Sequence, residues 1–129
     1  MTAKEKIESL TNGWYGFAVF SAVFYVLRKG IGPISLMWNF ASFLFALVFV
    51  FFIGRRLIAK GHLTRFILQV GSAIGTLAGT LGAGRMVFAF FGNWSFGLLL
   101  DAVAATVLVY MHARSFRVLT DKSVRAYFN

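Results

Sequence analysis

Residues 34–54 read ISLMWNFASFLFALVFVFFIG, a stretch of 21 residues without a charged side chain, and Arg55 and Arg56 follow it directly. About 20 predominantly apolar residues are enough for an α-helix to cross the hydrocarbon core of a bilayer. Phe, Leu and Val dominate the second half of the stretch, and basic residues are typical of the membrane surface beside a span. The stretch therefore predicts a transmembrane helix that ends at the two arginines.

Three further apolar runs of similar length lie before and after this span. A turn with two glycines and the only proline of the chain precedes it, and a basic interfacial loop or short helix, residues 55–65, follows it. A connection rich in Phe, residues 86–94, separates the last two runs. The predicted spans cover residues 10–27, 34–54, 66–84 and 95–111. We therefore expect an all-α fold in which residues 1–129 form a single integral membrane domain, a four-helix bundle of two helical hairpins.

Short amphipathic segments flank the four spans. In the polar segment 1–12, Ile7 and Leu10 lie three residues apart, as on one face of a helix. The tail, residues 112–129, is basic and also carries spaced apolar residues, namely Phe116, Val118, Leu119, Val124 and Tyr127. The first segment is therefore expected to form a short amphipathic helix, and the tail is expected to be partly amphipathic.

The composition of the whole chain agrees with a membrane protein. Hydrophobic residues make up 59% and charged residues 13% of the 129 residues, against about 45–50% and about 25% in soluble domains. A soluble fold of this size could not bury so much apolar surface, and a disordered chain would not contain it. The first ten residues do not resemble a cleavable signal peptide.

Few residues are available for catalysis or metal binding. The chain has no cysteine, which excludes disulfides and thiolate metal sites, and it has only four acidic residues. The two histidines, His62 and His112, lie beside arginines and are expected to be interfacial. No paired carboxylates, phosphate-cradling loop or nucleophile motif occurs. We therefore expect no cofactor, no metal, no catalytic residue and no enzymatic activity of the chain alone.

The net charge of +9 predicts the orientation of the spans. Four spans place both termini on one side of the membrane, and ten of the 13 basic residues then lie on that side. The other side holds Arg28, Lys29 and Arg85. If the first run were only an interfacial helix, the division would be a weaker eight against five. By the positive-inside rule we expect a multi-pass protein of the bacterial cytoplasmic membrane with both termini cytoplasmic.

The two hairpins show signs of an internal repeat. A shift of 59 positions aligns basic residues, glycines and hairpin ends, for example Lys6 with Arg65, Gly16 with Gly75 and Arg55 with Arg114. Such repeats would be parallel, related by an axis along the membrane normal. In a composition so rich in apolar residues, chance matches are the alternative explanation.

Gly71, Gly75 and Gly79 form a stripe of small residues in the third span, and Ser72, Thr76, Thr80 and Gly84 form a second stripe beside it. Small residues at four-residue spacing allow the close backbone approach that drives helix association in lipid. The stripe predicts either tight packing inside this bundle or self-association, which includes a pore lined by small residues.

Three polar residues are predicted inside or at the edge of the membrane. Asp101 lies about 10 Å into the fourth span, at 1.5 Å per residue, and an acid at that depth needs a partner or water. Arg85 is the expected ion-pair partner, and Asn39 lies at a similar depth in the second span. One interpretation is a structural ion pair with Asn39 bonded to a helix backbone, and the other is a polar cleft that opens to the outer leaflet.

Arginines cluster at the ends of the spans on the side of the termini. The members are Arg55, Arg56, Arg65, Arg114 and Arg117. Membrane orientation and binding of anionic lipids explain such a cluster, and so does specific recognition of a phosphate, because guanidinium groups bind phosphate in a bidentate manner. The charge lies in short loops rather than on a soluble patch, so we expect membrane lipids and no nucleic acid as partners.

The ends of the two hairpins share a pattern. The first hairpin ends in FFIGRR at residues 51–56 and begins at Lys6-Ile7, and the second ends in YMHAR at residues 110–114 and begins at Arg65-Phe66. Over residues 6–118 this pattern resembles the GtrA-like family of small four-span membrane proteins. Val50 and Val109 stand where that family has Asn.

The resemblance implies a flippase-like or accessory role for a polyprenyl-phosphate-linked sugar, with a glycosyltransferase as partner. Arg55, Arg56 and Arg114 would then hold the phosphate at the cytoplasmic face. The three intramembrane polar residues would line a path for the sugar. The alternatives are an oligomeric glycine-zipper channel or holin-like pore, and a structural subunit of a larger membrane complex that transports nothing. A homo-oligomer or a larger complex is expected in each case.

Overall fold

Five helices account for almost all of the chain, and the fold is all-α. The computed structural model describes all 129 residues. The first four helices have the length and hydropathy of membrane spans, as expected for a small polytopic membrane protein. The helices are α1 (Ala3–Lys29), α2 (Pro33–Ile58), α3 (His62–Asn93), α4 (Phe96–Leu119) and the short α5 (Lys122–Phe128).

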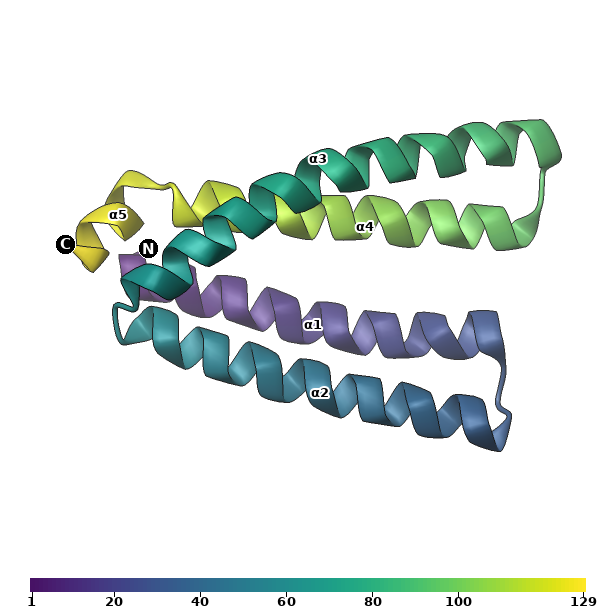
Figure 1. Cartoon of the computed structure of the whole chain (residues 1–129), viewed down its shortest axis with the longest axis horizontal. Coiled ribbons are helices and arrows are strands. Elements are labelled where there is room, and N and C mark those ends of the chain that lie inside the picture. The colour runs from purple at the N-terminus through teal and green to yellow at the C-terminus, as the bar shows by residue number, and fades with distance from the viewer.

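The long helices form two hairpins, α1 with α2 and α3 with α4 (Figure 1). Both short turns, residues 30–32 and 94–95, lie at one end of the molecule, which we call the turn end. Both termini, α5 and the α2–α3 connection lie at the other end, which we call the basic end. The hairpins meet at the basic end and diverge toward the turn end, so the molecule has the shape of a V (Figure 1).

The two hairpins run in the same direction, as a parallel duplication predicts. The first residues of α1 and α3, Ala3 and His62, are 59 positions apart, which is the shift that aligns the two halves of the sequence. Local signals fix the boundaries. Thr2 and Glu5 form a reciprocal capping box before α1. Gly30 has a φ of 81°, which favours glycine, and Pro33 is the first residue of α2.

All four long helices are longer than the predicted spans, and the basic segment 55–65 consists of the end of α2, a short turn and the start of α3 rather than a separate loop or helix. α3 continues nine residues past Gly84 to Asn93, so the connection predicted for residues 86–94 is wrong. α4 ends at Leu119 rather than near residue 111. Hydropathy marks where the apolar surface ends, whereas the helix continues until a turn residue stops it, here Trp94 in the left-handed region with a φ of 46°.

The apolar core lies at the basic end. α1, α2, α4 and α5 contribute six buried side chains to it, namely Ile7, Leu10, Leu57, Leu119, Val124 and Phe128. The amphipathic character predicted for both terminal segments is therefore confirmed. Polar contacts hold α5 on this core: Lys6 Nζ lies 3.0 Å from Asp121 Oδ1 and 2.9 Å from Ser123 Oγ, and the Tyr127 hydroxyl donates to the Ile58 carbonyl.

The glycine stripe of α3 packs against α4 within the same chain. A Cβ atom at Gly75 would lie 2.7 Å from the His112 ring, and one at Gly79 would lie 2.9 Å from a Val109 methyl group. Neither position has room for a side chain. Gly71 has open space around its Cβ position. Gly75 and Gly79 therefore serve packing inside the bundle, which is one of the two uses predicted for the stripe.

Candidate functional site: a cleft between the hairpins

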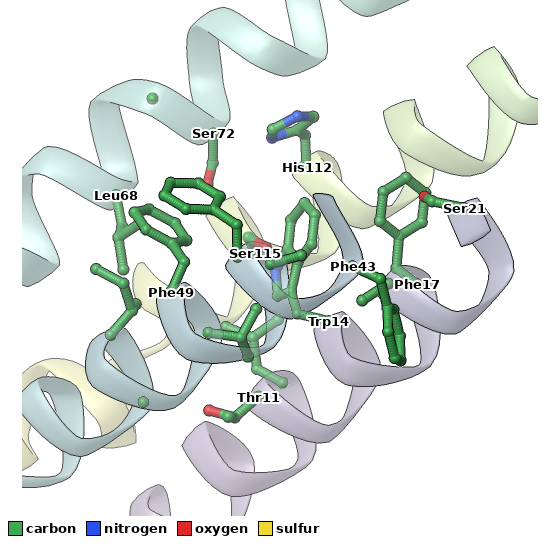
Figure 2. Close-up of a pocket in the computed structure, with 18 of the residues that line it drawn as sticks. Thr11, Trp14, Phe17, Ser21, Phe43, Phe49, Leu68, Ser72, His112 and Ser115 are labelled. Atoms are coloured by element: carbon green, nitrogen blue, oxygen red, sulfur yellow. Dashed lines mark hydrogen bonds between the residues drawn. The ribbon is translucent and has the colours of Figure 1, made fainter. Parts of the chain in front are cut away.

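A long apolar cleft lies between the two hairpins, with a volume of about 570 Å³. This size is within the range of about 300–1,000 Å³ that is typical of small-molecule sites. α1 and α2 form most of its wall, and parts of α3 and α4 complete it (Figure 2). Along α1 it extends from Leu10 to Tyr25, which is about 22 Å at 1.5 Å per residue. No Arg, Lys, Asp or Glu lines the cleft.

The spacing of residues on the first hairpin explains why the wall is continuous. Lining residues recur every three or four positions, so each helix turns one face toward the cleft. Several of them are small or hydroxyl-bearing, which keeps the cleft open where larger side chains would fill it. The faces comprise Leu10, Trp14, Phe17, Ala18, Ser21 and Tyr25 of α1, and Asn39, Phe43, Ala46, Val50, Ile53 and Leu57 of α2.

The core closes the cleft at the basic end. Leu10, Leu57 and Leu119 belong both to the core and to the lining of the cleft. Toward the turn end the hairpins diverge (Figure 1). The cleft is therefore closed at the basic end, and its part nearest the turn end is lined by α1 and α2 alone.

A group of polar side chains interrupts the apolar wall near the closed end (Figure 2). Trp14 Nε1 donates to Ser115 Oγ at 2.8 Å, and Ser115 Oγ in turn donates to the Met111 carbonyl at 2.8 Å. The His112 ring lies edge-on to Trp14, with 5.4 Å between ring centroids. These contacts join α1 to α4, and Ser72 of α3 completes the group from the opposite wall.

Asn39 lines the cleft, but its side chain is used in the fold. Asn39 Nδ2 donates to the Ala22 carbonyl at 3.0 Å and so joins α2 to α1. Of the two interpretations of this residue, the structure supports the one in which the amide satisfies a helix backbone.

The ion-pair partner of Asp101 is Arg28, and the expected pair with Arg85 is not formed. Arg28 Nε lies 2.9 Å from Asp101 Oδ1, and Arg28 Nη2 lies 3.0 Å from Oδ2, so the contact is bidentate. Gly97 makes room for it, because a Cβ atom there would lie 2.7 Å from Arg28 Nη1. α1 packs on α4, which brings the last turn of α1 to Asp101. Arg85 is exposed on α3.

The predicted polar path is therefore not assembled. Asn39 lines the cleft, whereas Asp101 and Arg85 do not. Asp101 instead connects the two hairpins toward the turn end, 73 positions away from its partner in the sequence.

Two of the predicted phosphate-binding arginines hold the fold together. Arg65 donates from Nε and Nη2 to the Leu119 carbonyl, at 3.2 and 3.1 Å, and so caps the end of α4. Its guanidinium lies 5.2 Å from the centre of the Phe128 ring. Arg114 Nη2 donates to Ser9 Oγ at 2.9 Å, and its side chain passes over Gly13.

The other three arginines are exposed at the basic end. Arg55 stacks on Phe51, at 5.6 Å from the ring centre, and Arg56 and Arg117 are free of ion pairs. Gly54 and Leu57, on the same turn of α2 as Arg55, line the closed end of the cleft. Arg55, Arg56 and Arg117 are therefore the predicted phosphate ligands with available charges, and each lies within two residues of a residue that lines the cleft.

The sequence did not identify Ser72 and His112 as a pair. In the sequence Ser72 is only a member of a stripe of small residues, and His112 is only an expected interfacial residue. Gly75 at the crossing of α3 and α4 is the one local signal, since a glycine in a helix marks close packing. The link between Trp14 and Ser115 spans 101 positions and has no sequence signal.

Comparison with known proteins assigns no function to this site. No protein-family model, no curated protein and no solved structure matches the chain. No group of three or more His, Cys, Asp or Glu side chains is arranged to hold a metal ion. The chemistry of the cleft and of its rim is therefore the basis for a functional proposal.

Proposed function

We propose that this protein binds a phosphate-bearing lipid, with the lipid chain in the cleft and the phosphate at Arg55 and Arg56. The cleft between the hairpins carries the proposal: it is apolar, holds about 570 Å³, and lies between helices that have the properties of membrane spans. An apolar cavity excludes water and favours hydrocarbon. Inside a bilayer the available hydrocarbon is a lipid chain.

The charge distribution supports a phosphate at the basic end. Arg55 and Arg56 lie in the chain between Gly54 and Leu57, which line the closed end of the cleft, and they have no acidic partner. Guanidinium groups form paired hydrogen bonds with phosphate oxygens. By the positive-inside rule the basic end is the cytoplasmic one, so the headgroup faces the cytoplasm. Arg65 and Arg114 act as positioning residues for the helices around the cleft.

The polyprenyl-phosphate-linked sugar implied by the GtrA-like pattern is a ligand of this kind. Of the two roles that the resemblance implies, the geometry favours the accessory one. A flippase needs a polar route for the sugar, but Asp101 is paired with Arg28, Asn39 is bonded to Ala22, and Arg85 lies outside the cleft. The protein then holds the carrier lipid and presents its headgroup to a glycosyltransferase, and it performs no chemistry itself.

Filling the cleft tests this function. In purified protein, Ala46→Trp places a large side chain in the cleft, whereas Ala41→Trp on the exposed face of the same helix is the matched control. We expect the first variant to retain about tenfold less polyprenyl phosphate in native mass spectrometry, a change of about 1.4 kcal/mol, and the control to match the unmodified protein. Equal retention by both variants would refute binding in the cleft.

A comparison of two ligands, one with and one without a phosphate, tests whether Arg55 and Arg56 bind the phosphate. Replacing both Arg55 and Arg56 by Ala is expected to weaken binding of polyprenyl phosphate by about tenfold while binding of polyprenol, which has the same chain without phosphate, stays unchanged. If polyprenyl phosphate binds the double variant as well as the unmodified protein, the phosphate does not lie at these residues.

A further inference from the structure

Some hydroxyl groups within the long helices are hydrogen-bonded to their own helix, and others are not. Five of them donate to the carbonyl four residues earlier at 2.6–2.9 Å, namely Thr11, Thr76, Thr80, Thr106 and Ser115. This is the usual solution in a membrane, because a hydroxyl surrounded by hydrocarbon has no water to bond. Three serines that line the cleft lack such a bond, namely Ser21, Ser42 and Ser72, and of these only Ser72 is buried and so most needs another partner.

Ser72 and His112 both line the cleft and form no hydrogen bond through their side chains within the chain. The residue Ser72 is only 5% exposed. Every fully enclosed polar side-chain atom of the protein has a partner, so the Ser72 hydroxyl reaches the open cleft. Figure 2 shows both side chains projecting into the space between the helices, one from α3 and one from α4.

The fold fixes the position of the imidazole ring. On one side the ring lies against Gly75, where a Cβ atom would approach ring atoms to 2.7 Å. On the other side it contacts the edge of Trp14, which Ser115 holds in place. Gly75 is one turn after Ser72 on α3, so the ring and the hydroxyl face the same part of the cleft. The two polar groups are thus pre-positioned and unpaired.

The depth of this pair corresponds to the polar end of a lipid. His112 directly follows the apolar run 95–111, and Ser72 lies six residues into the run 66–84, which is about 9 Å along the helix. The pair therefore lies in the half of the spans nearest the basic end, between the end of one apolar run and a point about 9 Å inside the other. Beyond it, toward the turn end, the cleft continues along α1 as far as Tyr25.

We propose that His112 and Ser72 bind the oxygen at the polar end of the lipid chain, through hydrogen bonds from the imidazole and the hydroxyl. This inference rests on the proposed lipid-binding function and specifies its ligand. A chain without oxygen leaves both groups unpaired in an apolar site, which is unfavourable. A lipid with a hydroxyl or phosphate-ester oxygen at this depth satisfies both groups, and its phosphate, where present, extends to Arg55 and Arg56.

Two isoprenoid ligands, one with a terminal oxygen and one without any oxygen, test the proposal without the arginines. Polyprenol carries a terminal hydroxyl, and squalene is an isoprenoid hydrocarbon without oxygen. We expect the unmodified protein to retain polyprenol about tenfold better than squalene in detergent. The double variant Ser72→Ala with His112→Phe keeps an aromatic ring between Gly75 and Trp14 but cannot form the bonds, and it is expected to retain both ligands equally.

Thr80→Val is the matched control, because it also removes a hydroxyl from α3, but at an exposed position outside the cleft. It is expected to retain the preference for polyprenol. If the double variant does not fold, Ser72→Ala alone is expected to reduce the preference, since this change removes only one oxygen atom.

The outcomes distinguish this inference from the function on which it rests. If the double variant still prefers polyprenol, His112 and Ser72 do not bind the lipid oxygen, although the cleft can still be the lipid site. If neither lipid is retained by the unmodified protein, the proposed function fails as well. If inorganic phosphate at millimolar concentration displaces polyprenol from the unmodified protein but not from the double variant, the pair binds a free anion and the inference is overturned.

Discussion

Asp101 illustrates how a single charged residue is accommodated in an apolar chain. Its carboxylate receives two hydrogen bonds from Arg28, and both side chains are partly exposed, at 28% and 37%. The pair therefore combines good geometry with access to solvent or headgroups. Its contribution to stability should lie between those of exposed and buried ion pairs.

We expect a coupling free energy of about 1 kcal/mol between Arg28 and Asp101 in a double-mutant cycle with alanine. The measurement is unfolding of the purified protein in mild detergent. The same cycle between Arg85 and Asp101 is expected to give a coupling near zero, because Arg85 forms no ion pair. A larger coupling for Arg85 would show that the hairpins are placed differently.

Gly75 is a second position where one residue controls the packing. We expect Gly75→Ala to destabilise the protein by about 1–3 kcal/mol, because the added methyl group displaces the His112 ring. Gly82→Ala is the control, since a Cβ atom there meets nothing within 4 Å, and it should be neutral or stabilising. If Gly75→Ala changes the oligomeric mass without lowering the unfolding temperature, the stripe acts between chains instead.

Among the elements, the short helix α5 is stabilised by contacts of its N-cap residue, Asp121. Asp121 precedes it, accepts a hydrogen bond from the Ser123 amide at 2.9 Å and contacts Lys6 of α1. Hydrogen bonds from the side chains of Ser123 and Lys6 hold the pKa of the Asp121 carboxyl far below its usual range. The ionised carboxylate thus stabilises the docking of α5 on the core.

The lowered pKa of the Asp121 carboxyl makes the stability of the folded protein depend on pH. A carboxyl whose pKa is lower in the folded state stabilises the protein above its unfolded pKa of about 3.9, and the stabilisation is lost as the pH falls below that value. We expect Asp121→Asn, which can still cap a helix, to have a lower unfolding temperature than the unmodified protein at about pH 6. The difference should shrink below about pH 4. A difference that grows on acidification would contradict this role.

The length of α3 has a consequence for its place in a bilayer. Its 32 residues correspond to about 48 Å, whereas the hydrocarbon core is about 30 Å thick. The helix must therefore tilt or extend beyond the hydrocarbon. The apolar run 66–84 predicts the part of α3 inside the membrane, but the hydropathy of the residues after Arg85 predicts a connection where the helix in fact continues. Helix continuation depends on backbone bonds and on the absence of a stop signal, which hydropathy does not measure.

At the scale of the whole molecule, several contacts near the basic end and one ion pair toward the turn end join the hairpins, with the cleft between them. The core joins them at the basic end, and the Arg28–Asp101 pair joins them toward the turn end. We expect separation of the hairpins at this ion pair to control the entry of lipid into the cleft.

Cross-linking across the Arg28–Asp101 pair tests this expectation. The chain has no cysteine, so Arg28→Cys with Asp101→Cys introduces one defined pair of thiols. We expect a short thiol-specific cross-linker between them to slow exchange of bound polyprenol at least about tenfold, because the hairpins can no longer separate. Each single-cysteine variant, treated with the same reagent, should exchange lipid at the rate of the untreated protein. Unchanged exchange in the cross-linked protein would show that lipid enters elsewhere.

The sequence by itself determined the four apolar helices, their pairing into hairpins and the amphipathic ends that carry Ile7 and Leu119. These features follow from hydropathy and from spacing along one helix, which are local properties. Only the tertiary structure decided that Asp101 meets Arg28, that Arg65 caps α4, and that Ser72 and His112 face one cleft. Such contacts join residues far apart in the chain. They depend on how side chains pack where helices cross, and hydropathy does not encode that packing.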